Sequence, residues 1–254
     1  MERLLITQRE QVLWTVLLST ESKRPIQIQL QPLEAAPLLR QVRVARVRDV
    51  VKNIHAAFVD LGDGMQGFYS LEDNPAHLFS QPRTETASSV FSKRPLRSGD
   101  EILVQVEKEA IKTKDPVVTS HIQLSGRFCV LTAGKTGLGI SAKISDKEWK
   151  AEARERLLPY LSNDWGFILR TQAREASFEE IEGEMKDLSE RFRQLIEKGR
   201  YSTCYSVLYQ EPPTYLSGLR DLNLQKVAEI VTDLPQVYEK MQETLRLTQP
   251  EALS

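Results

Sequence analysis

Apolar residues that alternate with polar ones at a period of two dominate the first half of this chain. Residues 26–31 read Ile-Gln-Ile-Gln-Leu-Gln, and the same spacing returns over residues 102–106. A period of two is typical of β-strands with one buried face, because successive side chains point to opposite sides. Together with the apolar runs at residues 4–6 and 12–18, the pattern predicts a three-stranded antiparallel meander over residues 1–31.

Residues 38–126 continue the β pattern in short pieces. The runs at residues 56–62 and 67–69 flank a four-residue turn and predict a hairpin. Residues 74–99 are rich in Pro, Ser, Thr and Arg, which favours a long exposed loop, and residues 116–124 predict another strand. About five short strands with one long loop are typical of a small OB-type barrel.

Strong helix signals follow residue 140. Ser145 precedes Glu148, and Ser177 precedes Glu180, at the spacing of a capping box, in which side chains satisfy the first N–H groups of a helix. Gly199 is expected to cap the end of the second helix. Apolar residues of that helix recur at spacings of three and four, which predicts a buried stripe that packs in the core, with a groove for a cofactor or a partner as the alternative. The stripe consists of Phe178, Ile181, Met185, Leu188, Phe192 and Leu195.

The C-terminal part predicts a strand at residues 203–209 and then two helical stripes. The first stripe consists of Leu224, Val227 and Ile230. The second follows Pro235 and consists of Val237, Met241 and Leu245.

The composition excludes several classes of protein. With 34 Lys and Arg against 35 Asp and Glu the net charge is −1, so the chain is not a uniformly basic nucleic-acid coat protein. Cys129 and Cys204 form no Cys-x-x-Cys pair, and His55, His77 and His121 are scattered, which argues against a zinc finger and a disulfide framework. The apolar runs are too short for a transmembrane helix or a signal peptide, so we expect a reducing cytoplasm.

Carboxylates that converge on a metal ion are the usual requirement for cleaving a phosphodiester. Asp60 is the foremost candidate because it ends a predicted buried strand, yet no Asp-x-Asp or Asp-x-Asn accompanies it. Turn formation by Asp60 and Asp63 is favoured over a metal role. The remaining candidates are Asp100, Asp115 and Asp221.

The sequence carries stronger signals of nucleic-acid binding than of a metal site. Phe58 and Phe68 lie on adjacent predicted strands, where the aromatic rings of an OB-type sheet stack on single-stranded bases; the alternative is that either ring belongs to the core. Lys108, Lys112 and Lys114 cluster at the next strand end, where they either follow phosphates or form a solvated turn.

Arg170 and Thr171 form a second candidate site at the end of a predicted strand. A guanidinium fork and a hydroxyl held by a sheet suit a phosphate group. A surface salt bridge is the equal alternative from these residues alone.

An ordered series of stretches resembles the ribonuclease E/G endoribonucleases over residues 1–247. The order of the pieces carries the resemblance, since each piece alone is weak. The stretches are Ala56–Gly62 with Gly67-Phe68, Gly99–Glu109, Leu124-Ser125-Gly126, Gly139-Ile140-Ser141, Leu169-Arg170-Thr171 and Leu219-Arg220-Asp221.

The resemblance implies an α+β fold in which an OB-type barrel and a small α/β sensor are inserted into a split ribonuclease-H-like α/β scaffold. Residues 1–37 and 203–254 would be the two parts of the scaffold. Residues 38–125 would be the barrel, of the type named after ribosomal protein S-one, and residues 126–202 the sensor for RNA that carries a 5′-monophosphate.

The resemblance also implies two sets of site residues. The residues that match the RNA-contacting positions of the family's barrel are Phe58, Phe68, Lys108 and Lys114. Those that match its 5′-phosphate pocket are Gly126, Val130, Arg170 and Thr171, of which the last two would hold the phosphate and the first two shape the pocket.

Departures from the family pattern limit what we expect of this sequence. The family's magnesium-binding aspartates follow the second ribonuclease-H-like part and its zinc-linking cysteines lie further on, whereas this sequence stops at Ser254. Ala45 replaces the glycine usual in the first barrel strand, and Ala142-Lys143 replaces a basic pair near the sensor.

We therefore expect a chain that binds single-stranded RNA and prefers a 5′-monophosphate, without catalytic residues, a metal or a cofactor of its own. Self-association and other RNA-decay proteins are further expected partners. The alternatives are a complete metal-dependent endoribonuclease that uses carboxylates such as Asp60 and Asp221, and a non-catalytic scaffold associated with RNA or the ribosome.

Overall fold

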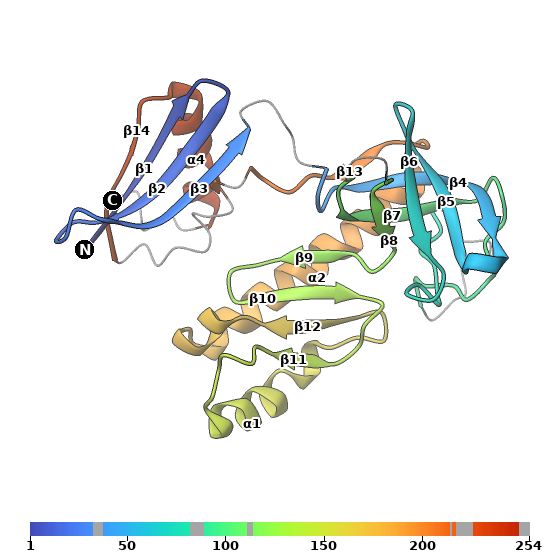
Figure 1. Ribbon diagram of the computed structural model, residues 1–254. Helices are drawn as coiled ribbons and strands as arrows, with labels where there is room; N and C mark the ends of the chain where they lie inside the picture. The colour runs from blue at the N-terminus through green and yellow to red at the C-terminus, as the bar shows by residue number, and fades with distance from the viewer. Residues whose placement is uncertain (33–37, 82–88, 111–113, 214, 217–225, 249–254) are drawn as a thin grey trace. The chain divides into compact units, whose positions relative to one another are not determined.

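The structure is a computed structural model, which describes residues 1–32, 38–81, 89–110, 114–213, 215–216 and 226–248. The chain forms two compact units (Figure 1). Unit 1 combines residues 1–37 with residues 211–254, and unit 2 is the continuous segment 38–210.

Unit 1 contains a sheet with the strand order β14-β1-β2-β3. The strands are β1 (Glu2–Arg9), β2 (Val12–Ser19), β3 (Pro25–Pro32) and β14 (Val227–Thr232), and the helix α4 (Pro235–Thr248) follows β14. The predicted antiparallel meander of β1, β2 and β3 is confirmed, as is the second C-terminal helix. The core joins the sheet to α4 through Leu4, Ile6, Leu13, Leu17, Val237 and Met241.

Strand β14 shows that the first helical stripe predicted near the C-terminus was wrong. Val227 and Ile230 lie on a strand that pairs parallel to β1, with Ile230 opposite Leu4. The β-branched residues of this segment suit a sheet, and the partner strand at the other end of the chain decides the outcome. Leu224, the remaining residue of that stripe, lies outside the described residues.

Unit 2 begins with a closed barrel, so an α+β fold with an OB-type barrel is confirmed. Its strands pair in the order β4-β5-β6-β8-β7, and pairing of β4 with β7 closes the ring. They are β4 (Val42–Val51), β5 (Ala56–Gly62), β6 (Met65–Ser70), β7 (Glu101–Lys108) and β8 (Val117–Thr119), with β13 (Val207–Tyr209) added beside β4. Strand β13 is thus shorter than the strand predicted over residues 203–209.

The predicted hairpin is present, with a tighter turn than expected. Strands β5 and β6 are joined by Asp63 and Gly64, whose φ angles are 55° and 75°. Two successive positive φ values are those of a type I′ turn, whose twist matches that of the flanking strands.

The segment 74–99 has no helix or strand in its described residues, but it is not simply exposed. Leu78 and His77 are buried, and the Nδ1 of His77 lies 2.8 Å from the Tyr69 hydroxyl, which donates to Ser120 at 3.0 Å. This polar network ties the loop to Tyr69 of β6 and to Ser120, which follows β8. Burial, and next the charge of Arg94, lower the pKa of His77 from 6.5 to about 4.

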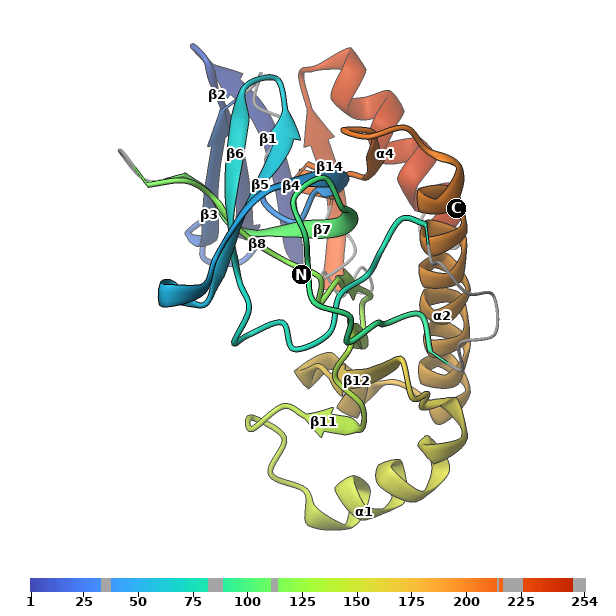
Figure 2. The same ribbon diagram turned by 90° about the vertical axis from the view of Figure 1, so that its right-hand side faces the viewer.

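The second part of unit 2 packs a sheet of order β11-β12-β10-β9 against a long helix (Figure 2). The elements are β9 (Gln123–Ser125), β10 (Cys129–Ala133), β11 (Leu138–Ile140), α1 (Lys147–Arg156), β12 (Trp165–Leu169) and α2 (Phe178–Tyr201). Short 3-10 helices connect the elements of unit 2 at η1 (Lys52–Ile54), η2 (Leu158–Tyr160) and η3 (Thr171–Glu175). The single strand predicted over residues 116–124 is thus two strands, β8 and β9.

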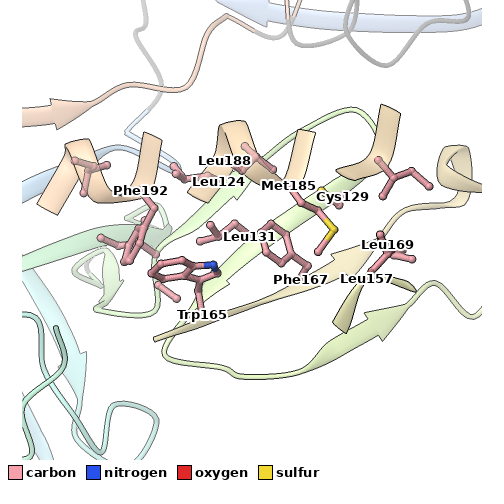
Figure 3. Close-up of a cluster of buried hydrophobic side chains, with 14 of the residues drawn as sticks. Leu124, Cys129, Leu131, Leu157, Trp165, Phe167, Leu169, Met185, Leu188 and Phe192 are labelled. Atoms are coloured by element: carbon pink, nitrogen blue, oxygen red, sulfur yellow. The ribbon is translucent and has the colours of Figure 1, made fainter. Parts of the chain in front are cut away.

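The predicted stripe of α2 is core packing. Figure 3 shows Met185, Leu188 and Phe192 facing the sheet residues Leu131 and Phe167. The capping box of Ser177 and Glu180 is present, and it satisfies the first N–H groups of the helix.

Two predicted helix boundaries are wrong. Asp146, and not Ser145, caps α1, because its carboxylate accepts the Trp149 N–H at 3.0 Å. Gly199 lies inside α2, which continues to Tyr201, and a Cβ there would lie 2.8 Å from the side chain of Leu103. Close packing against Leu103 of β7, and not helix termination, therefore favours glycine at this position.

Across the described parts of the chain, every helix is too short or too polar to cross a membrane.

Candidate nucleic-acid interface

Phe58 and Phe68 face outward from the barrel. They lie directly opposite each other on β5 and β6, and their ring centroids are 6.0 Å apart in an edge-to-face arrangement. Their strand neighbours Val59 and Tyr69 are fully buried in the barrel core, whereas the two phenylalanine rings are only partly buried. Because successive side chains alternate between faces, the rings lie on the opposite face of the sheet from the core.

The same face continues across the next strands towards a lysine. Phe68 pairs with Val117 on β8, and Val117 pairs with Lys108 on β7. The four residues therefore form a row across adjacent strands, which we call the barrel row: Phe58, Phe68, Val117 and Lys108. Lys108 is exposed at its end, and exposed Lys114 lies just before β8, while Lys112 falls outside the described residues. The row joins partly open aromatic rings to positive charge.

The candidate carboxylates are engaged by the protein. Asp60 accepts the Gly62 N–H at 2.9 Å and the Tyr205 hydroxyl at 3.4 Å, and Arg48 lies 3.9 Å away. Asp100 receives a fork of two bonds from Arg94, each 3.0 Å long. Asp60 thus closes the end of β5, the turn role that its position suggested.

The other carboxylates do not converge with these two. Asp63 is largely exposed and lies 3.8 Å from Arg43, and Asp115 accepts a bond from Gln66 at 3.2 Å. No group of three His, Cys, Asp or Glu side chains suited to a metal ion occurs among the described residues, and Asp221 is not one of those.

The residues predicted for the phosphate pocket meet where β12 ends. Arg170 donates from Nη1 to the Gly126 carbonyl at 2.8 Å and from its backbone N–H to the Phe128 carbonyl at 2.7 Å. Thr171 is exposed at the start of η3, with its hydroxyl 3.3 Å from that of Ser141. The structure thus brings an arginine and two hydroxyl groups to one corner of the sheet.

An apolar strip of Val130 and Ile168 lies beside this corner. Val130 of β10 lies opposite Ile168 of β12, and Ile168 lies opposite Gly139 of β11. The strip is on the sheet face away from α2, and Ile168 is 45% exposed there, next to a position without a side chain. The arrangement offers a flat apolar surface adjacent to positive charge.

Ala142 and Lys143 follow β11 and are exposed. The Lys143 backbone N–H donates to the Ser141 hydroxyl at 3.4 Å, and the same hydroxyl lies 3.3 Å from that of Thr171. Arg174 is bound to Asp146 at 2.9 Å.

Glu184 is a further residue of this corner that the sequence did not reveal. Its carboxylate accepts the backbone N–H groups of Arg127, Phe128 and Cys129, the last two at 2.7 and 2.8 Å. The available signal was its place three residues after Ile181 and four before Leu188, on the buried face of α2. Burial, and next the Glu184 charge, raise the pKa of the Cys129 thiol, so Cys129 stays protonated and unreactive.

Together these parts describe an α+β chain. In the sequence, the segments that form the OB-type barrel and the smaller sheet-and-helix lobe come between the two segments that form the sheet of unit 1. The profile of the Ribonuclease E/G family matches residues 123–254, and the chain belongs to that family. The family resemblance predicted from the ordered stretches is therefore confirmed.

Curated relatives carry the same family names. Ribonuclease G of Haemophilus influenzae is 29% identical over 219 residues, which are 83% of this chain and 44% of that protein. Ribonuclease E of the same organism is 27% identical over 216 residues, or 82% of this chain and 22% of that protein. Ribonuclease E of Buchnera aphidicola subsp. Acyrthosiphon pisum is 26% identical over 243 residues, or 94% of this chain and 26% of that protein. The chain thus spans less than half the length of these relatives.

Proposed function

We propose that this chain binds single-stranded RNA and acts as a substrate-holding part of a ribonuclease E/G-like RNA-processing protein. The barrel row carries the proposal. Two touching aromatic rings on an outward face provide stacking surfaces for successive bases, and Lys108 with Lys114 provides charge for the phosphates that link them. Membership of the ribonuclease E/G family supports RNA as the ligand.

The proposal assigns residues 38–125 to the barrel and residues 126–202 to a sensor for the 5′ end, between scaffold parts 1–37 and 203–254. Arg170 and Thr171 would bind a 5′-monophosphate, and the strip of Val130 and Ile168 would take the terminal nucleoside. The forked guanidinium and the hydroxyl both donate hydrogen bonds. The oxygens of a phosphate accept such bonds and carry negative charge, whereas a 5′-hydroxyl carries no charge.

In this proposal the chain holds RNA and does not cut it. Asp60 and Asp100 are each bound by protein donors and close separate structural features, so they do not match the converging carboxylates of a magnesium site. The proposed setting is the reducing cytoplasm, in which Cys129 and Cys204 remain free thiols.

A titration of labelled single-stranded RNA at several salt concentrations tests RNA binding. If about 3–5 phosphates are neutralised, the slope of log affinity against log salt should be about −2 to −4. A double-stranded RNA of the same length is the control and should bind more weakly, because its bases are not available for stacking. A flat slope, or no binding at low salt, would contradict the proposal.

A further inference from the structure

Glu184 links α2 to the loop of residues 126–129 in an unusual way. One carboxylate receives three consecutive backbone N–H groups, from Arg127 through Cys129. Bonds from N–H groups to an ionised acceptor are among the stronger hydrogen bonds in proteins. The loop is therefore held at a fixed place against the helix.

Gly126 is shaped to admit this carboxylate. A Cβ at Gly126 would lie less than 3.0 Å from the terminal carbon and both oxygens of Glu184. Any side chain at position 126 would have to displace the carboxylate from its three donors. The close approach of the carboxylate, and not a positive φ angle, therefore favours glycine at this position.

Two peptide groups of the loop connect Glu184 to Arg170. The unit between Gly126 and Arg127 donates its N–H to Glu184 and accepts the Arg170 guanidinium on its carbonyl, at 2.8 Å. The unit between Phe128 and Cys129 donates its N–H to Glu184 and accepts the Arg170 backbone N–H on its carbonyl, at 2.7 Å. Because a peptide unit is planar, fixing its N–H also fixes the direction of its carbonyl.

We propose that Glu184 is a positioning residue for the 5′-phosphate pocket, acting on Arg170 through these two peptide groups. An anion at the N–H end of a peptide polarises it and strengthens its carbonyl as an acceptor. Glu184 thereby holds both the backbone and the guanidinium of Arg170 before a ligand arrives, and such preorganisation raises affinity and selectivity. This inference rests on the proposed function of the pocket.

The Glu184→Gln variant tests the inference with little change in shape. Whichever way the amide turns, its NH2 group meets at least one backbone N–H, so at least one of the three bonds is lost. We expect the affinity ratio of 5′-monophosphorylated to 5′-hydroxyl RNA to fall from ~10-fold or more to below ~3-fold. Affinity for the 5′-hydroxyl RNA, which depends on the barrel, should stay unchanged.

Two further variants separate positioning from stability. Glu190→Gln removes an exposed carboxylate that lies further along α2, where it bonds Arg193 and Gln194, and it should leave the ratio unchanged. Gly126→Ala displaces the Glu184 carboxylate from the other side and should lower the ratio as Glu184→Gln does. All ratios are measured below the melting temperature of the least stable variant.

The outcomes distinguish the two proposals. A ratio near one in the unmutated chain would refute the sensor function and this inference with it. The other outcome is that the unmutated chain prefers 5′-monophosphorylated RNA and that Glu184→Gln and Gly126→Ala keep the same affinity ratio, even if they melt at lower temperatures. This outcome would refute the positioning role alone.

Discussion

The barrel row predicts a clear separation between binding and stability at Phe58 and Phe68. Replacing either ring with alanine should weaken RNA binding by ~1–3 kcal/mol, the usual contribution of one base stacked on an aromatic side chain. Because the rings are only partly buried and touch each other edge to face, the loss of fold stability should be near the ~0.5–1.5 kcal/mol of an aromatic pair. A fully buried phenylalanine would cost ~3–5 kcal/mol of stability.

The contact between the rings gives a second quantity to measure. At a centroid distance of 6.0 Å the two rings are close enough to support each other against neighbouring bases. The double variant should therefore lose less binding energy than the sum of the single variants, by ~0.5 kcal/mol or more.

The assay pairs RNA titrations with chemical denaturation for each variant. Val59→Ala is the matched control, because Val59 follows Phe58 on β5 but points into the core. It should lose stability by ~0.5–3 kcal/mol and keep its RNA affinity at a temperature where it is folded. The argument fails if the Phe58 and Phe68 variants lose ~3–5 kcal/mol of stability, or if they bind RNA as well as the unmutated chain.

Other predictions concern the pocket, RNA cleavage and the stability of the fold. The chain should bind 5′-monophosphorylated RNA more tightly than 5′-hydroxyl RNA, by ~10-fold or more. Arg170→Ala should erase this difference while binding of longer strands persists. The measurement compares the affinities of matched short RNAs that differ only at the 5′ end. A highly purified sample should not cleave RNA with magnesium, and cleavage that a point change in the chain abolishes would overturn this. The pKa of His77 is lowered in the folded chain, so the unfolded chain takes up a proton at this residue first as the pH falls. The free energy of unfolding should therefore be intact above pH 6.5 and should fall by about 3 kcal/mol towards pH 4. Denaturation curves of His77→Gln, measured over the same pH range, should lack this part of the decline. Gly183→Ala, at an open helix position next to Glu184, should stabilise α2 by ~0.5–1 kcal/mol, and a lower melting temperature would contradict the packing described.

Local signals in the sequence were sufficient for some elements. The capping box at Ser177 and the spacing of the apolar residues after it define α2, because both act within a few turns of the same helix. The outward position of Phe58 and Phe68 also follows from alternation once the inward residues of the hairpin are known. The barrel as a whole could be predicted because all its strands lie within one continuous segment, although a long loop separates β6 from β7.

Other features depend on partners that are far away in the chain. The spacing of Val227 and Ile230 is compatible with a helix, and only pairing with β1 makes it a strand. Gly199 was expected to end a helix, whereas its role is to let Leu103 approach. Glu184 had no local signal for its bonds, because its partners lie far away in the sequence, in the loop before β10 and at the first residue of that strand. Such contacts arise from the tertiary structure, which sequence periodicity does not encode.

The division of unit 1 between the two ends of the chain sets an order for folding during synthesis. Strands β1, β2 and β3 are synthesised before unit 2, whereas β14 and α4, which complete their sheet and cover its core, are synthesised after it. Unit 2 is one continuous segment and can fold while β14 and α4 are still being translated. Until α4 is made, the buried leucines of the meander, Leu4 of β1 with Leu13 and Leu17 of β2, lack the side chains that cover them in the finished unit. A nascent chain of this design therefore carries an open apolar sheet while the whole of unit 2 is synthesised, and exposed apolar surface of this kind favours aggregation until α4 covers it.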